Sequence, residues 1–443
     1  MKKILLLLLA VLLAAALPCG SLADEEGDIY GVHWKLDGNA TLTFTANGSD
    51  GPAMIFEGPW DAFGYKVNAV VFGEGVTDVW ASLENLTGLT SVTFGPDVAV
   101  IDRCDLSGTS RLKTIVLQVK QDCFSMDDLG FAPAYRPEKI EASEDSCYVA
   151  ENGLLLTKDG KTLVAALGSG KLRVPDGVTT VRDGAIRYTG YTEVTFPETV
   201  TEIGTWAISY NNKLQRLVLP ASLTRAGASA FEENRTLKSI QHLGCTLTVE
   251  AGENGRTSER IFHECAYPRI DLPPMNFVPR WTCTYNKALA TITVGNGTEE
   301  IASDAFFALK AIKEIYIPDS VKAIAEDFIQ ESSDKYTIFC SAGSYAEQFA
   351  AAHGIKCKPV VFATSLTLSE SSLTLAKGKG ASLSGTIAPA DATVKKLEWL
   401  SSNEAVATVN NGKVKAVAPG ECDIVCAVLD GSQSRAVCHV TVE

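Results

Sequence analysis

The sequence offers few side chains whose types and spacing suit catalysis. Its five histidines are dispersed, with no pair at the spacing of metal ligands. His263 stands in a His-Glu-Cys run that lacks the second histidine of a zinc-protease helix. The run from Gly168 to Leu172 fails as a phosphate loop, because Ala165 and Leu172 replace the required glycine and hydroxyl residue. The sequence therefore predicts a turn there, and no catalytic residue, cofactor site or metal site.

The charge of the chain narrows the classes of partner, and its cysteine content narrows the classes of fold. The chain of 443 residues has a formal charge of −14 and no basic run, which argues against nucleic acid and anionic lipid. Carboxylates are plentiful, yet none form a pair that the sequence pattern places in a cleft. The 12 cysteines are scattered, unlike a dense disulfide framework, and most are expected to be small core residues.

The first 23 residues have the pattern of a secretory signal peptide. Lys2 and Lys3 precede an apolar run over residues 4–17, and small residues occupy positions 21 and 23. That run is too short for a spanning helix, and the proline before Cys19 disfavours lipid attachment there. We expect cleavage after Ala23, a secreted or cell-surface protein, and no membrane span after cleavage.

A phrase of similar residues recurs along the remaining chain. It reads YTEVTFPETVTEIG from Tyr191 and IKEIYIPDSVKAIA from Ile312, with further copies from Leu89, Leu214 and Leu289. Units of 22 or 23 residues separate neighbouring copies, which is typical of a solenoid. Two alternating apolar places followed by Pro or Gly indicate a short strand in each unit. About ten stacked coils are therefore expected to form a parallel strand face, because one coil cannot bury its own apolar edge.

The unit L-x-x-V-x-F-P-x-x-V-T-x-I-G-x-x-A-I resembles the BspA-type leucine-rich repeat of bacterial surface and secreted proteins. Residues 147–167 resemble an insert that these proteins carry between coils, and residues 241–288 break the period with several prolines. Cys340 and Cys357 flank the expected last helix, and they are either bridged or two separate buried thiols. The domains implied are an N-terminal β-hairpin cap over 24–65, a solenoid over 66–339 and a C-terminal capping helix over 340–358.

The sequence changes character after Pro359. Residues 362–443 contain short alternating runs, and Asn411-Gly412 is a strong hairpin signal between two of them. The segment closely resembles the bacterial immunoglobulin-like (Ig-like) domain of group 2, with Trp399 as its core tryptophan. That resemblance implies a β-sandwich that serves as a spacer or adhesion module. Few contacts are expected to cross Pro359, so the two modules are expected to unfold separately.

The outward side chains of the repeat strands suit contact with a partner better than acid–base chemistry. Glu193, Arg216, Glu314 and Tyr316 carry a charge or an aromatic ring and are the candidate partner-binding residues. We expect a mainly β, non-catalytic, exported binding or adhesion protein of a bacterium, with a protein or a cell-surface or envelope glycan as its partner. Two other classes stay open: an exported hydrolase with its site in 241–288, and a passive structural protein of the cell envelope.

Overall fold

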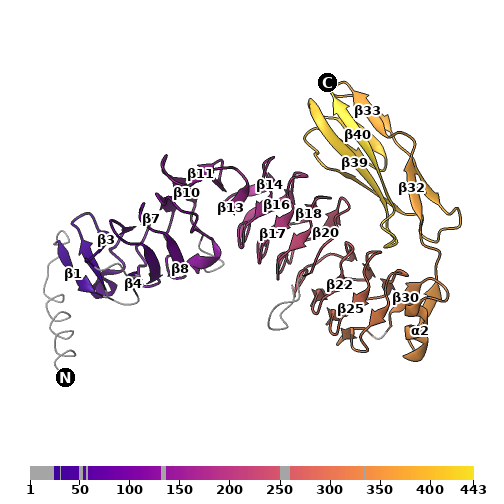
Figure 1. The fold of residues 1–443 in the computed structure, drawn as a ribbon, viewed down its shortest axis with the longest axis horizontal. Coiled ribbons are helices and arrows are strands. Elements are labelled where there is room, and N and C mark those ends of the chain that lie inside the picture. The colour runs from indigo at the N-terminus through magenta and orange to yellow at the C-terminus, as the bar shows by residue number, and fades with distance from the viewer. Residues whose placement is uncertain are drawn as a thin grey trace. The chain divides into compact units, whose positions relative to one another are not determined.

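The structure, a computed structural model, describes residues 24–443 except 30, 49–52, 56–57, 131–135, 250–259 and 334. The predicted signal peptide over residues 1–23 lies outside the described residues. The chain divides into an N-terminal unit, which ends at Leu167 and includes Arg182–Tyr188, and a C-terminal unit of Gly168–Val181 and Thr189–Glu443. Both units consist mainly of strands (Figure 1). No helix among the described residues is long and apolar enough to span a membrane.

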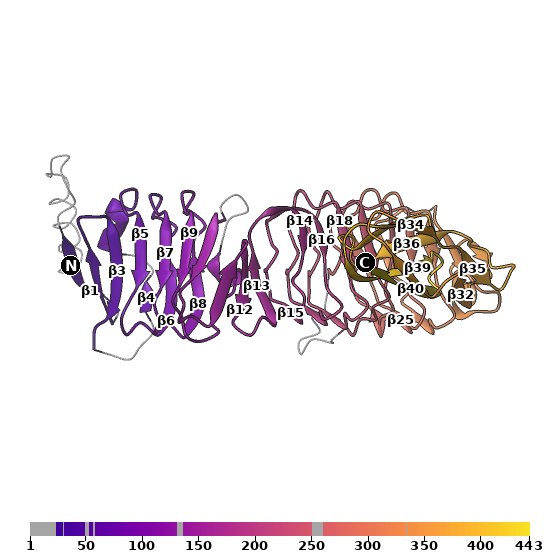
Figure 2. The ribbon, with the colours of Figure 1, turned by 90° about the horizontal axis from the view of Figure 1, so that it is seen from above.

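The N-terminal unit begins with an antiparallel hairpin that continues into a parallel sheet. Figure 2 shows β3, β5, β7 and β9 side by side in this sheet. Ala69 pairs with Ser91 and Ser91 pairs with Thr114, which is the spacing of one coil. The strands of this sheet are β1 (Glu25–Ile29), β2 (Val32–Leu36), β3 (Thr41–Ala46), β5 (Ala69–Phe72), β7 (Ser91–Phe94), β9 (Thr114–Leu117) and β10 (Lys139–Ala142).

Inward-facing phenylalanines form a column through this unit. Phe44 stacks on Phe72 with ring centroids 5.7 Å apart, and Phe72 stacks on Phe94 at 5.3 Å. All three rings are fully buried, because residues at equivalent places of successive coils lie directly above one another. A second parallel sheet encloses the same core, with strands β4 (Ala53–Ile55), β6 (Asp78–Ser82) and β8 (Val100–Asp105).

An antiparallel meander closes the N-terminal unit where the sequence indicates an insert. Its strands are β11 (Tyr148–Glu151), β12 (Leu154–Thr157) and β13 (Thr162–Ala166). Gly160 in the turn between the last two strands has a φ of 70°, a conformation that favours glycine.

The C-terminal unit has its own parallel strand face, made of two sheets. Glu193 pairs with Arg216 and Arg216 with Ser239, while Thr291 pairs with Glu314. The first sheet contains β14 (Ser169–Arg173), β16 (Gly190–Thr195), β18 (Arg216–Leu219) and β20 (Ser239–His242). The second contains β21 (Arg269–Asp271), β24 (Thr291–Thr293), β27 (Glu314–Tyr316), β30 (Thr337–Cys340) and β31 (Cys357–Pro359). The turn expected over Gly168–Leu172 is wrong, since most of that run forms β14.

Short strands mark the other sides of the coils. They form three groups of parallel strands, each made from equivalent places of successive coils. These strands are β15 (Thr180–Val181), β17 (Glu202–Ile203) and β19 (Arg225–Ala226); β22 (Phe277–Val278), β25 (Glu300–Ile301) and β28 (Ala323–Ile324); and β23 (Cys283–Thr284), β26 (Phe306–Phe307) and β29 (Ile329–Gln330).

The described part of residues 241–288 belongs to the solenoid. Leu247 forms a parallel bridge with Met275, and Arg269 pairs with Thr291 in the next coil. The coil that joins β20 to β21 is longer than its neighbours, which is why the period appears broken in the sequence. The prolines lie between the short strands, where no ladder hydrogen bond is required of them.

Helix α2 (Tyr345–Ala352) follows the last full coil. The Ser344 hydroxyl accepts a hydrogen bond from the Glu347 backbone N–H at 3.3 Å, as an N-cap does. Ala346, Phe349 and Ala350 are buried. The sulfur atoms of Cys340 and Cys357, on neighbouring strands β30 and β31, lie 3.2 Å apart. A bridge between them stays a prediction.

The remaining strands form the Ig-like β-sandwich. Asn411 and Gly412 both have positive φ in the turn between β37 and β38, as a two-residue hairpin loop requires. Val414, Ile424, Cys438 and Val440 are among its buried core residues. The strands are β32 (Ser365–Leu368) with β35 (Gly385–Ala388); β33 (Ser372–Leu375), β40 (Arg435–Val442), β39 (Gly420–Val428) and β36 (Leu397–Ser401); and β34 (Gly380–Ser382), β38 (Lys413–Ala416) and β37 (Ala407–Asn410).

Candidate functional site: the strand face of the C-terminal unit

The Ig-like domain packs against the strand face of the repeats within the C-terminal unit. Val218 and Leu243 of the repeats form one apolar cluster with Leu400 and Val425 of the Ig-like domain, and each is at most 5% exposed. The expectation of few contacts across Pro359 is therefore wrong. The outward place of a repeat strand looks like a solvent position in sequence, and nothing in its pattern reveals that a distant strand covers it.

Two of the predicted partner-binding residues contact each other and the Ig-like domain. The Arg216 guanidinium lies 2.5 Å from a Glu193 carboxylate oxygen and 3.2 Å from an oxygen of Glu404. The Lys171 ammonium lies 2.8 Å from the other Glu193 oxygen. Burial acts to raise the pKa of the Glu193 carboxyl, but the contacts with Lys171 and Arg216 outweigh it and hold the pKa below its ordinary value. Glu193 and Arg216 thus take part in domain docking.

A second polar contact joins the tip of the Ig-like domain to the repeats. Arg435 donates a hydrogen bond to the backbone carbonyl oxygen of His242 at 2.9 Å, and its guanidinium lies 3.8 Å from the Asp271 carboxylate. Burial, with the positive charge of Arg435, lowers the pKa of His242 to about 4. The imidazole is therefore neutral near pH 7 and stays within the protein as a structural contact.

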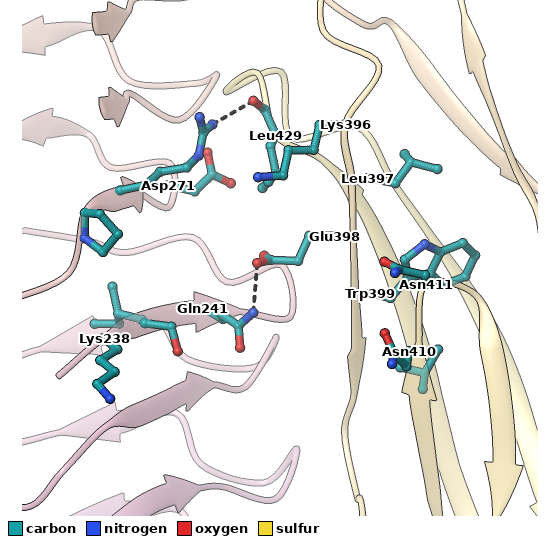
Figure 3. Close-up of a pocket in the computed structure, with 15 residues that line it drawn as sticks. Lys238, Gln241, Asp271, Lys396, Leu397, Glu398, Trp399, Asn410, Asn411 and Leu429 are labelled. Carbon is teal, nitrogen blue, oxygen red and sulfur yellow. Dashed lines mark hydrogen bonds between the residues drawn. The ribbon is translucent and has the colours of Figure 1, made fainter. Parts of the chain in front are cut away.

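A cavity of about 430 Å³ is lined by residues of the repeat strands and of the Ig-like domain (Figure 3). Gln241 and Glu398 point toward each other across it, and the amide of Gln241 donates to the carboxyl of Glu398 at 2.8 Å. Arg269 donates to the carbonyl oxygen of Leu429 at 2.6 Å, closing another side. Burial raises the pKa of Glu398 above its ordinary value.

Glu398 and Asp271 line the same cavity, with their pKa values displaced in opposite directions. Such a displacement also occurs in acid–base pairs. Burial acts to raise the pKa of Asp271, but the contacts with His242, Arg435 and Thr293 outweigh it and hold the pKa below its ordinary value. Asp271 is thus already engaged by partners from both sides of the domain contact, and its side chain is only 10% exposed. This occupancy favours a structural role for the pair.

The other two predicted residues lie toward the last coils, where a groove opens. Glu314 lines this groove of about 490 Å³, together with Lys313, Thr337, Phe339 and Lys358. We call these strands, β27, β30 and β31, the open end of the strand face. The positive charge of the lysines that line the groove is opposite to the net charge of the chain.

An aromatic stack borders the groove. The Tyr316 ring stacks on Phe339 with centroids 4.6 Å apart and planes inclined by 13°. The Lys358 ammonium lies 5.8 Å from the Phe339 centroid, and the Arg269 guanidinium lies 6.0 Å from that of Tyr316. Both rings are half-buried, and each has a cation over it.

Phe339 is absent from the predicted partner-binding residues, although the repeat pattern in the sequence points to it. Phe339 pairs with Tyr316 across neighbouring strands, so extending the repeat register by one coil would have identified it. Glu398 and Glu404 carry no such signal, because their role depends on how the Ig-like domain docks. Among the described residues, one group has the composition and spacing to hold a metal ion: Glu232, Glu233 and His263, whose donor atoms lie within 4.8 Å of one another.

Comparison with known proteins identifies both modules. The family model for the BspA type leucine-rich repeat region matches residues 168–251, 254–335 and 280–372. The model for the bacterial Ig-like domain (group 2) matches residues 362–438. Neither description names an enzyme.

Individual relatives match parts of the chain. An Ig-like virion protein of Serratia phage KSP90 is 41% identical over 85 residues, which cover 19% of this chain and 33% of that protein. The chain thus spans about a third of the length of this curated relative.

Two solved structures cover more of the chain at lower identity. A leucine-rich repeat protein from Eubacterium ventriosum is 17% identical, covers 70% of this chain and 96% of its own, and has a TM-score of 0.41. A leucine rich cell surface protein from Faecalibacterium prausnitzii is 18% identical, covers 76% and 94%, and has a TM-score of 0.29. By its two family matches, this chain combines a BspA-type leucine-rich repeat region with a C-terminal bacterial Ig-like domain of group 2.

Proposed function

We propose that the protein is an exported, non-catalytic binding or adhesion protein of a bacterium. The open end of its strand face contacts the partner, which is a protein or a glycan of a cell surface or envelope. The groove beside the Tyr316–Phe339 stack carries this proposal. Half-buried aromatic rings beside charged side chains are typical of residues that dominate binding energy.

The Ig-like domain limits where the partner binds. It covers the strand face around Arg216 and Gln241, while Glu314 lines the groove over the last coils. Tyr316 lies at the border between the two, since Arg269 contacts both its ring and Leu429 of the Ig-like domain. The domain then serves as a spacer or as a second contact at the edge of the groove. Glu193 and Arg216 contribute to binding indirectly, by holding the Ig-like domain in place.

The proposal is tested by capturing a partner from host proteins and envelope glycans with the purified chain, and then measuring affinity. We expect Tyr316→Ala to weaken binding by at least about tenfold, since truncating a residue that dominates binding costs about 2 kcal/mol or more. Arg216→Ala is expected to weaken binding less, because its side chain faces the Ig-like domain.

Thr93→Ala is the matched control for that experiment. Thr93 occupies the same kind of outward strand place in the N-terminal unit and is partly buried there. Circular dichroism checks that each variant keeps its fold. If Tyr316→Ala binds like the wild-type chain while Arg216→Ala does not, the partner site lies on the face that the Ig-like domain covers.

A further inference from the structure

A partly buried group of acidic side chains and one imidazole lies where consecutive coils of the C-terminal unit meet. Glu232 and Glu233 come from one coil and His263 from the next, and their donor atoms lie within 4.8 Å of one another. The backbone N–H of Glu233 donates to the carbonyl oxygen of His263 at 2.9 Å, which fixes the two coils at this point.

Glu232 lacks a partner in this group. Its residue is 5% exposed, and its carboxylate makes no hydrogen bond or ion pair with any other residue that the structure describes. Its carboxylate lies beside the donor atoms of His263 and Glu233 and is therefore available to a positive ligand at this place.

The imidazole of His263 is held in place through one of its ring nitrogens. Its Nδ1 atom contacts the Thr284 hydroxyl, and metal-binding histidines are commonly fixed by such a contact of the second ring nitrogen. Its Nε2 atom lies 3.5 Å from an oxygen of Glu264.

The surrounding charges leave room for a cation. Glu232, Glu233 and Glu264 supply three carboxylates, while Arg235 pairs with one oxygen of Glu233 at 2.7 Å and one of Glu264 at 2.6 Å. Arg260 adds a second, more distant positive charge, and its guanidinium lies over the Trp281 ring. Each of the two paired carboxylates keeps a second oxygen for another ligand.

We propose that Glu232, Glu233 and His263 bind a divalent cation, and that Zn²⁺ is the ion this donor set favours. Mixed carboxylate and imidazole ligands suit Zn²⁺, whereas Ca²⁺ takes oxygen ligands. Tetrahedral Zn²⁺ needs donor atoms about 3.4 Å apart, which rotation of the two long glutamate side chains supplies. The site is separate from the strand face and independent of the proposed partner binding.

The test is titration of the chelator-treated chain with Zn²⁺ by calorimetry. We expect one tight site in the wild-type chain, and an affinity at least about tenfold weaker in the isosteric variant Glu232→Gln and in His263→Gln. Co²⁺ in place of Zn²⁺ is expected to give visible bands without the near-ultraviolet band of a thiolate ligand, which separates this site from binding by cysteines.

His439→Gln is the matched control. His439 also lies beside two carboxylates, those of Asp423 and Glu421, but its side chain is 52% exposed. Its loss is expected to leave the tight site unchanged. The proposal is overturned if the wild-type chain binds no Zn²⁺, if Glu232→Gln and His263→Gln bind as tightly as wild type, or if the Co²⁺ spectrum shows a thiolate ligand.

Discussion

Glu398 shows how a single side chain can make the contact between two modules depend on pH. It lies in the cavity beneath the Ig-like domain and accepts a hydrogen bond from Gln241. Burial raises the pKa of its carboxyl above the ordinary value of 4.5. Between the two values the native state binds more protons than the unfolded state, so the contribution of Glu398 to the free energy of unfolding falls as pH rises.

We expect Glu398→Gln to remove that dependence. The amide keeps an oxygen that can accept from Gln241, so the free energy of unfolding should increase near pH 8 and change little near about pH 3, where the carboxyl is protonated in both states. Urea denaturation of both chains at the two pH values measures this. Glu421→Gln, at a side chain that is 69% exposed, is the control. An equal effect of Glu398→Gln at both pH values would contradict the role of the carboxyl.

The four candidate partner residues show what the sequence pattern predicts about a single side chain and what it does not. The alternation of each repeat places Glu193, Arg216, Glu314 and Tyr316 at outward positions, and all four lie on the strand face of the described structure. What lies opposite each residue is not encoded in the repeat. Arg216 pairs with Glu404 of another module, while Tyr316 stacks on the next coil.

At the scale of elements, strand β36 links the core of the Ig-like domain to the repeats. Leu400 points out of the sandwich into the cluster with Val218, Leu243 and Val425, and it is 2% exposed. Its neighbour Trp399 packs on the opposite side, against the core of the sandwich. This alternation within one strand is readable in the sequence, but the partner that buries the outer side is not.

We expect Leu400→Ala to destabilise the C-terminal unit by about 2–3 kcal/mol, in the lower part of the range for truncation of a buried leucine. The lost contacts include those with the repeats, so the effect should be measurable as a lower urea midpoint. Val417→Ala is the control, because Val417 is 39% exposed and belongs to the same domain. If both variants unfold at the same urea concentration, the cluster contributes little to the docked state.

The strands of the regular repeats can be predicted from the sequence more reliably than those of the long coil. A register of 23 residues recurs wherever a strand pairs with its equivalent in the next coil, as between Glu193 and Arg216. The strands of the coil between β20 and β21 cannot be predicted in this way, because the extra residues of this coil shift the 23-residue register. Its strands are recognised only once Arg269 is seen to pair with Thr291.

For the C-terminal unit as a whole, docking makes the stability of the two modules interdependent. The contacts include a buried apolar cluster, the Arg216–Glu404 ion pair and the Arg435–His242 hydrogen bond. Removing residues 362–443 would expose Val218 and Leu243 to water and leave Arg216 with fewer partners. The repeats and the sandwich are therefore expected to unfold together, in contrast to modules joined by a bare linker.

Calorimetry of the full chain and of a chain lacking residues 362–443 tests this interdependence. We expect the deletion to lower the unfolding temperature of the remaining C-terminal repeats by several degrees, since each lost kcal/mol shifts the midpoint by about 2–4 °C in a domain of this size class. The N-terminal unit provides an internal control, because its buried phenylalanine column belongs to a separate compact unit. If the repeats melt at an unchanged temperature without the sandwich, the contacts add no stability, and the strand face around Arg216 is free to accept a partner whenever the Ig-like domain leaves it.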